Sequence, residues 1–157
     1  MIKDSIHPKG DVDIWVDYKF GKQELISVHN TVLTTGRLAL ANGLANQIGD
    51  SFEFYITRMI FGDSGTTGGV KKVVDAGRTG LFGVTQVSKP ALANSDTSVS
   101  AQVIFTSVIL FSEAVGLVLN EMALQMANGD LFSMTTFPDL SKTADMQITF
   151  NWRENFI

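Results

Sequence analysis

The sequence contains no cysteine and only two histidines, His7 and His29. The absence of cysteine excludes disulfides, a thiolate nucleophile and any metal site built on sulfur, and it leaves the redox compartment undetermined. Two isolated histidines are too few for an ordinary metal site. We therefore expect neither a bound metal nor a cofactor.

Basic residues are few as well, and they do not gather in one segment. Twelve Lys and Arg stand against sixteen Asp and Glu, and the nearest approach to a basic run is Lys71-Lys72. A nucleic-acid-binding protein of this size normally has a basic face, so no nucleic-acid partner is expected. The longest strongly apolar stretch, residues 103–111, is too short to span a bilayer, and residues 1–8 lack the apolar segment of a signal peptide. We expect a soluble protein without a membrane partner.

Phenylalanine is abundant: the chain has eleven Phe, against two Tyr and two Trp. At 157 residues the chain has the usual size of one domain, which buries roughly 68–70% of the surface of its unfolded chain. So much aromatic surface without a polar group must be buried in a core or in a subunit interface. The candidate interface residues are Trp15, Phe20, Leu81, Phe82, Phe105 and Phe111.

Alternating apolar and polar residues predict strands along most of the chain. Residues 12–20 alternate with a period of two, and after a turn at Gly21-Lys22 residues 24–28 return, so residues 1–29 are predicted to form an N-terminal β-hairpin arm. Further strands are predicted at residues 52–61, 100–111, 117–126, 131–137 and 146–153. Asn128-Gly129 between two apolar runs predicts a tight type I′ hairpin turn.

One helix is predicted after Thr34 or Thr35 as N-cap, with Gly49 as its C-terminal cap. The residues that recur at helical spacing are Leu38, Ala41, Leu44, Ala45 and Ile48. Residues 62–98 are rich in Gly, Ser and Thr and predict a long loop with room for a short strand. The predicted fold class is mainly β: an antiparallel β-sandwich-like domain at residues 30–157, with one packed α-helix and the hairpin arm.

Residues 103–111 are apolar on both faces of the predicted strand. Such a strand is a hazard at an exposed edge and is usually central in a sheet covered on both sides. In an oligomer, a neighbouring subunit can supply one of these covers. Both interpretations stay open, and together with the many Phe they predict a homo-oligomer or a subunit of a larger shell.

No motif predicts catalysis. Residues Gly62 to Gly65 copy the surroundings of the nucleophile in trypsin-like serine proteases, but that chemistry needs a His base and an orienting Asp, and neither histidine has a fitting context. A phosphate loop needs G-x-x-x-x-G-K-[ST], and no Ser or Thr follows Lys71-Lys72. Asp11, Asp13 and Asp17 share one face of a predicted strand, as on a solvated face. We predict no catalytic residue and no enzyme activity.

Several short motifs follow one another in a fixed order from Asn30 to the end of the chain. They are residues 30–37, 61–65, 119–124, 127–132, 136–138, 142–143 and 146–152. This order resembles small virion proteins of tailed bacteriophages, namely collar, tail-fibre-attachment and related proteins. Those proteins show a similar Asn-Glu strand, Gly hairpin, Leu-Phe, Phe-Pro and Lys-Thr return, and final Thr-x-x-Trp strand. The resemblance implies a β-sandwich-like building block with no catalytic residues to transfer.

The expected function is therefore that of a non-enzymatic structural subunit of a tailed-phage virion, in the neck or collar or as a tail-fibre adaptor. Fibre proteins usually continue into a long shaft, whereas this sequence stops at Ile157, as expected of a stand-alone module. It would assemble in the host cytoplasm and bind copies of itself and capsid, neck or tail proteins through apolar contacts. One alternative is a capsid decoration or cement protein. Another is a carbohydrate-binding module for host attachment that uses Trp15 or Trp152.

Overall fold

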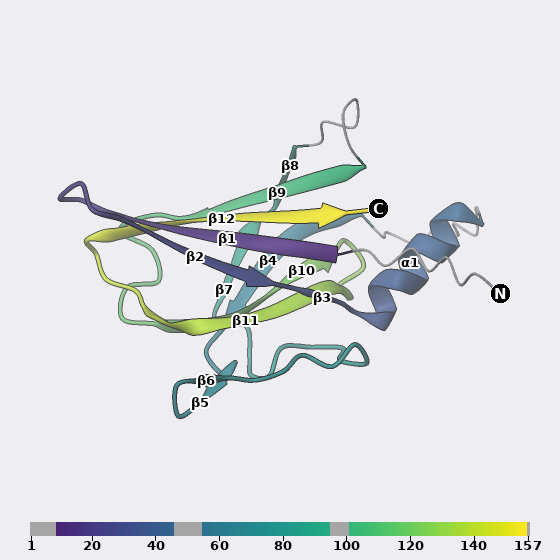
Figure 1. Ribbon diagram of the computed structural model, residues 1–157, viewed down its shortest axis with the longest axis horizontal. Coiled ribbons are helices and arrows are strands. Elements are labelled where there is room, and N and C mark those ends of the chain that lie inside the picture. The colour runs from purple at the N-terminus through teal and green to yellow at the C-terminus, as the bar shows by residue number, and fades with distance from the viewer. Residues whose placement is uncertain (1–8, 46–54, 95–100, 157) are drawn as a thin grey trace.

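The computed structural model describes residues 9–45, 55–94 and 101–156, which form two five-stranded antiparallel sheets with one helix at one end (Figure 1). In spatial order, sheet A contains β2 (Gln23–His29), β1 (Lys9–Tyr18), β12 (Met146–Asn155), β9 (Gln102–Ile109) and β8 (Leu92–Asn94). Sheet B contains β3 (Thr31–Val32), β11 (Leu131–Ser141), β10 (Val118–Met126), β4 (Ile56–Gly62) and β7 (Val87–Pro90). The predicted β-sandwich-like fold is confirmed.

The chain passes directly from one sheet to the other at two places. Around Asn30 it leaves β2 in sheet A and enters β3 in sheet B, and around Ala91 it leaves β7 in sheet B and enters β8 in sheet A. The Asn30 amide still donates to Gly10 O at 3.0 Å and the Ala91 amide to Thr57 O at 3.0 Å. Both corners of the sandwich are therefore closed by continuous backbone.

The N-terminal hairpin is part of sheet A. β1 lies between β2 and β12 and pairs with β12 in antiparallel register from Lys9–Asn155 to Tyr18–Met146. The alternation of the sequence buries Val12, Ile14 and Val16 completely. Residues 9–29 thus belong to the sandwich and do not form the separate arm expected at 1–29, because β1 buries one face in the core and pairs along both edges.

Two apolar clusters hold the sheets. The first cluster lies between the two sheets. In it, the Phe61 and Phe150 ring centroids are 4.5 Å apart, and the Phe137 and Phe150 ring centroids are 6.3 Å apart. A second cluster covers the outer face of sheet B and contains Leu33, Ile60, Leu81, Ala123, Leu131 and Met134. β10 and β11 are consequently buried on both faces along residues 119–124 and 131–137.

β9 is covered by the described chain on one face only, so residues 103–111 are not a strand covered on both sides by the chain itself, and the alternative of a face covered by a neighbouring subunit stays open. Its inner residues Phe105, Ser107 and Ile109 are buried, whereas Ile104 and Val108 on its outer face are half-buried. In sheet A, β9 lies between β12 and the short β8. Its outer face is thus left uncovered by the described part of the chain, and the strands covered on both faces are β10 and β11.

The helix α1 (Thr34–Leu44) begins one residue after Leu33, which takes the N-cap position predicted for Thr34 or Thr35. Thr35 instead donates its hydroxyl to Leu131 O. A Cβ at Gly36 would lie 2.3 Å from Phe132 O, so glycine lets the helix approach β11 closely. The predicted helix end at Ile48 and Gly49 lies outside the described residues, as does the start of the predicted strand 52–61.

The β10–β11 hairpin turns at Asn128-Gly129 as predicted, but with another geometry. The Gly129 amide donates to Met126 O at 2.9 Å, the Met126 amide donates to Asp130 O at 2.8 Å, and Gly129 has φ +93°. Asn128 has no positive φ, so the turn is a type I turn followed by a left-handed glycine. The type I′ prediction is corrected because only one residue here adopts positive φ.

Residues 62–98 contain the small hairpin of β5 (Thr66–Thr67) and β6 (Val70–Lys71), and then β7 and β8. Residues 72–86, between β6 and β7, are all described and form neither helix nor strand. It passes beside sheet B (Figure 1), where Leu81 is buried and Val74 and Phe82 contact the second cluster. Residues 72–86 of the predicted long loop therefore cover part of the outer face of sheet B.

Candidate functional site

Glu121 of β10 holds the loop against sheet B. Its side chain is completely buried and accepts three backbone amides: Ser64 N at 3.1 Å and Gly83 N at 3.1 Å on Oε1, and Phe82 N at 2.6 Å on Oε2. A buried carboxylate is stable only when its oxygens are hydrogen-bonded. Glu121 therefore fixes two distant parts of the loop to one point of the sheet.

Asn120 binds the same turn from the neighbouring position. Its Oδ1 accepts from the Gly65 amide at 2.7 Å, and its Nδ2 donates to Asp63 O at 3.1 Å, to Thr66 Oγ1 at 3.1 Å and to Asp139 Oδ1 at 2.9 Å. All of its polar atoms are thus occupied. We call Asn120, Glu121 and the 62–65 turn the polar frame.

The glycines of the 62–65 turn are explained by this frame. A Cβ at Gly62 would lie 2.5 Å from Glu121 Oε1, and a Cβ at Gly65 would lie 2.3 Å from Asn120 O. Ser64 donates its hydroxyl to Asp63 Oδ1 at 3.0 Å. In the described ranges, Ser64 has no histidine among its hydrogen-bond partners, so the motif has the geometry of a close-packed turn.

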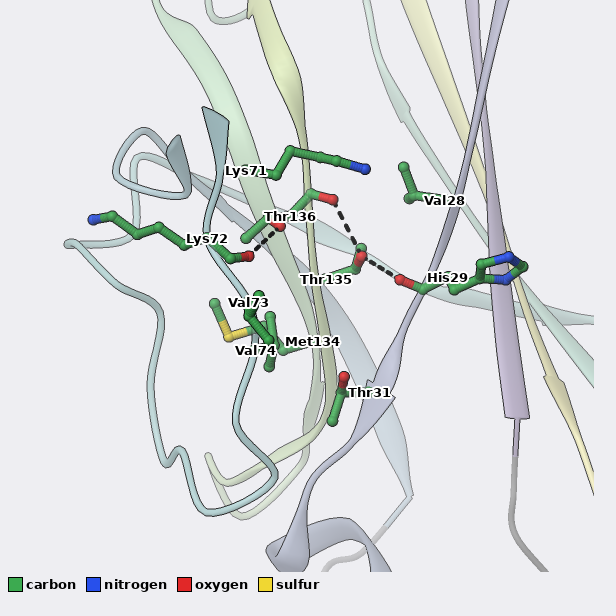
Figure 2. A pocket seen from close by; sticks show the side chains of 10 residues that line it. All are labelled: Val28, His29, Thr31, Lys71, Lys72, Val73, Val74, Met134, Thr135 and Thr136. Atoms are coloured by element: carbon green, nitrogen blue, oxygen red, sulfur yellow. Dashed lines mark hydrogen bonds between the residues drawn. The ribbon is translucent and has the colours of Figure 1, made fainter. Parts of the chain in front are cut away.

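A groove of about 290 Å³ lies where the chain crosses from β2 to β3, opposite residues 71–74 (Figure 2). The Thr135 hydroxyl donates to His29 O at 2.6 Å, and the Thr136 hydroxyl donates to Lys72 O at 2.8 Å. Adjacent hydroxyls of β11 therefore bind the two segments on either side of the groove, the end of β2 and residues 71–74. Figure 2 shows the His29 ring turned away from the groove. Its Nδ1 lies 2.5 Å from Asp11 Oδ1 on the exposed face of sheet A. Among the described residues, the groove is therefore lined by threonine, lysine, valine and methionine side chains, with the His29 ring outside it.

The outer face of sheet A has a row of four cross-strand neighbours, which we call the Trp15 row. Leu25 pairs with Trp15, Trp15 with Thr149 and Thr149 with Val108. Trp15 and Val108 are half-buried, and Leu25 is 48% exposed. The row therefore crosses β2, β1, β12 and β9 and is apolar except for the hydroxyl of Thr149.

Polar pairs flank the Trp15 row. Asp13 accepts from Ser27 Oγ at 2.7 Å and from Arg153 Nη1 at 2.8 Å, and Asp17 accepts from Gln23 Nε2 at 2.6 Å. The Ser27 hydrogen bond, aided by Arg153, lowers the pKa of Asp13 despite partial burial. The aspartates that the sequence places on one face are thus paired across strands.

The six candidate interface residues lie in different environments. Trp15 belongs to the Trp15 row, and Phe20 is 87% exposed beside Gly21 in the β1–β2 turn. Phe82 and Phe111 are half-buried; Arg78 lies 3.7 Å above the Phe82 ring and Lys19 lies 5.4 Å above the Phe111 ring.

Leu81 and Phe105 are buried in the two apolar clusters of the chain itself. Trp152 is buried as well, and its indole N–H donates to Glu154. Among the two tryptophans named for carbohydrate binding, only Trp15 is therefore accessible.

Lys142 is a buried lysine that holds the segment before β10. Only 2% of the residue is exposed, and its Nζ donates to Phe111 O at 3.1 Å and to Thr143 O at 2.8 Å. Burial lowers the pKa of Lys142, although the Glu113 carboxylate nearby opposes this shift. The ammonium thus serves as a double donor to backbone carbonyls.

Glu154 of β12 is a buried acid that the sequence analysis missed. It is 1% exposed, and its Oε1 accepts from Ser133 Oγ at 2.7 Å, from Trp152 Nε1 at 2.9 Å and from Asn30 Nδ2. Burial raises the pKa of Glu154, and these three hydrogen bonds counteract the shift in part. The alternation of Met146, Ile148, Phe150 and Trp152, continued by one more step, would have placed Glu154 inside.

The second carboxyl oxygen of Glu154, Oε2, is buried. Among the residues that the structure describes, no group donates to Glu154 Oε2 or shares a hydrogen bond with Asn30 Oδ1, although both atoms are buried. Glu154 also lines a pocket of about 410 Å³ at the α1 end of the sandwich, which we call the Glu154 pocket. The other lining residues are Leu40, Tyr55, Ile56, Ala93, Val103, Phe105, Phe132 and Phe156.

Within residues 9–45, 55–94 and 101–156, no three His, Asp or Glu side chains gather as ligands for a metal ion. No helix of these ranges has the length and apolar character needed to cross a membrane. Comparisons of the chain with protein-family models, curated proteins and solved structures found no match. The functional argument therefore depends on the residues and their geometry.

Proposed function

We propose that the protein is a non-enzymatic structural subunit of a tailed-bacteriophage virion, in the neck or collar or as a tail-fibre adaptor, and that it assembles through apolar subunit contacts. The supporting observation is that several motifs of the resemblance to phage virion proteins have a structural role in this fold. Residues 62–65, Asn120 and Glu121 meet in the polar frame, and Lys142 ties two loops together. These motifs stabilise a building block and leave its outer surfaces for binding.

The Trp15 row is the contact surface that we propose. Tryptophan is enriched among the residues that dominate binding energy, because it buries a large area at a small entropic cost. The flanking Asp13–Arg153 pair would supply a polar rim around this strip. Phe20, at the tip of the adjoining turn, would extend the same contact.

Mass spectrometry of density-purified particles from a culture that carries the gene tests the proposal. The wild-type chain should be present in the particles at a fixed copy number. Trp15→Asp and Leu25→Asp should fold but be depleted from particles, because a charge would be buried at the contact. Val84→Asp, at a position 72% exposed on the loop, is the matched control and should be incorporated normally.

Absence of the wild-type chain from purified particles would refute the virion assignment. Normal incorporation of both row variants would refute the contact surface. Binding of the protein at an outer capsid face would favour the decoration-protein alternative over the neck or adaptor position.

A carbohydrate-binding function is the second candidate, and the accessible Trp15 ring between Asp13 and Asp17 favours it. Aromatic faces flanked by carboxylates suit sugar rings, which present C–H groups and hydroxyls. Glycan-array binding by the wild-type protein that Trp15→Ala abolishes would support this function. Equal binding by both proteins, or none, would exclude it.

A further inference from the structure

The outer edge of β2 is open along most of its length. β2 is the last strand of sheet A, next to β1, and within the described residues no other strand pairs with its far side (Figure 1). Of β2, only Val28 and His29 line the groove beside residues 71–74. A strand edge of this kind presents a row of free backbone N–H and C=O groups, which pair readily with another chain.

The backbone groups at this edge belong to alternate residues. In a strand, the N–H and C=O of one residue point to the same edge, and successive residues alternate. Lys22 O accepts from the Tyr18 amide and the Asn30 amide donates to Gly10 O, and β2 pairs with β1 in continuous register between these two bonds. Even-numbered residues therefore face β1. The odd-numbered residues, which face the open edge, are Gln23, Leu25, Ser27 and His29.

β2 lacks the features that protect the other outer strands of the two sheets. Natural proteins keep strand edges from pairing by making them short, by placing Lys or Pro on them, or by bulges. In the described part of the chain, β3, β8 and β7 have two, three and four residues, and β7 ends at Pro90. β2 has seven residues, contains neither Lys nor Pro, and pairs with β1 without a bulge. Its carboxylate, Glu24, is engaged by Lys22 and the Tyr18 hydroxyl. β2 is therefore the edge suited to a partner.

We propose that two copies of the chain pair edge to edge along β2, antiparallel and about a two-fold axis at Leu25, so that their two A sheets form one continuous sheet. An antiparallel strand is complementary to itself about such an axis, so both copies use the same surface. Each copy would satisfy the free N–H and C=O groups of Gln23, Leu25 and Ser27 in the other. The proposal is independent of the virion assignment, because the contact requires only a second copy of this chain.

Charge and hydrogen bonding select the register of this pairing. With the axis at Leu25, this half-exposed side chain lies opposite its own copy, and the two Trp15 rows join end to end. An axis at Glu24 would place two carboxylates opposite each other, which is unfavourable. An axis at Ile26 would require the His29 carbonyl, which already accepts a hydroxyl from β11. The register centred on Leu25 avoids both costs.

Single cysteines test the contact, because the chain has none of its own. In the proposed dimer, Leu25→Cys places two thiols on directly opposite residues, whose Cα atoms would be about 5.5 Å apart, within the range of a disulfide. Mild oxidation should crosslink this variant about tenfold faster or more than Ser27→Cys, whose two copies would lie about 13 Å apart along the strands. Leu92→Cys, at an exposed leucine in the edge strand β8, is the control for random collision and should crosslink as slowly as Ser27→Cys.

Sedimentation tests the backbone contact. The wild type should form a dimer at concentrations up to about 1 mM. Leu25→Pro removes the N–H at the axis, and an edge strand tolerates Pro where its N–H points out of the sheet, so this variant should be folded and monomeric. Leu25→Lys keeps the backbone N–H but places like charges opposite each other, and should raise the Kd of the dimer about tenfold or more. Leu92→Lys is the matched control and should dimerise like the wild type.

The proposal would be overturned by a wild type that is monomeric at about 1 mM, or by equal crosslinking rates of Leu25→Cys and Leu92→Cys. Faster crosslinking of Ser27→Cys than of Leu25→Cys, or a dimer that Leu25→Pro and Leu25→Lys both leave intact, would overturn it too. Thermal unfolding of each variant verifies the fold, and if Leu25→Pro fails to fold, Leu25→Lys decides the question. A monomeric wild type that is still present in purified particles would refute only this contact, and a dimer that is absent from particles would refute only the virion assignment.

Discussion

Glu121→Gln should loosen the loop that covers sheet B without unfolding the protein. The substitution preserves the size of the side chain, but only one of its two terminal atoms can still accept a hydrogen bond. If the carbonyl oxygen takes the place of Oε1, the Ser64 and Gly83 amides keep their partner. The Phe82 amide, now 2.6 Å from Oε2, would then face another donor.

The magnitude follows from these contacts. A hydrogen bond to a charged group is worth about 1.5–3 kcal/mol, and bonds to an ionised acceptor are roughly twice as strong as neutral ones. Losing one bond and weakening two predicts about 2–4 kcal/mol of destabilisation, before any relaxation of the loop. A domain of this size is stable by about 5–15 kcal/mol, so the variant should remain folded.

Urea unfolding and amide hydrogen exchange measure this effect. The Phe82 amide should lose the most protection, and Ser64 and Gly83 should lose less. The Gly65 amide, held by Asn120, is an internal control and should change little. Ser64→Ala removes only the hydroxyl bond to Asp63 and should barely alter the urea midpoint. An unchanged midpoint together with full protection of Phe82 would refute the role assigned to Glu121.

Three further variants test other parts of the structure. Lys142→Met should destabilise the protein by about 1–3 kcal/mol, because two backbone carbonyls lose their donor. Since the folded-state pKa of Lys142 is lowered, the wild type should gain stability relative to this variant as pH rises toward the ordinary lysine pKa. A stability difference between the two proteins that does not change with pH would contradict the burial argument. Gly129→Val forces a β-branched residue to φ +93° and should lower the free energy of unfolding by about 1–3 kcal/mol, as measured by urea titration. Gly80→Val is the control, because Gly80 has open space around it and no positive φ, and it should be much less destabilising. A larger destabilisation by Gly80→Val than by Gly129→Val would contradict the turn geometry. Because the pKa of Glu154 is raised in the folded state, the folded protein takes up a proton at a higher pH than the unfolded chain does. Thermal unfolding should therefore show the wild type gaining stability relative to Glu154→Gln as pH falls toward the ordinary glutamate pKa. A loss of relative stability on acidification would show that the pKa is lowered instead.

The strands could be predicted because their signal is local. Alternation in residues 146–153 and 12–20 places the inner residues Ile14, Phe150 and Trp152 correctly, since each faces the core in a period of two. The hairpin at Gly129 was predictable for the same reason. The pairing of β1 with β12 could not be predicted, because nothing in the local sequence of β1 identifies β12 as its neighbour.

Buried polar residues explain most of what the sequence did not reveal. Glu121 and Asn120 looked like ordinary polar positions within β10, and their hydrogen-bond partners lie between 19 and 57 residues away along the chain. Glu154 sits at the end of a clear alternation, where an acid normally marks the solvent. The choice between a core and a surface for such residues depends on donors from other strands, which only the folded chain brings together.

The pairing of β1 with β12 also constrains the order of folding. Residue 9 pairs with residue 155, so the centre of sheet A cannot close until residue 155 has left the ribosome. Before then, the β1–β2 hairpin has an open apolar face and an unpaired edge, while sheet B needs only residues 31–141. Contacts between such distant residues make folding slow, and the waiting hairpin is where premature association between nascent chains would begin.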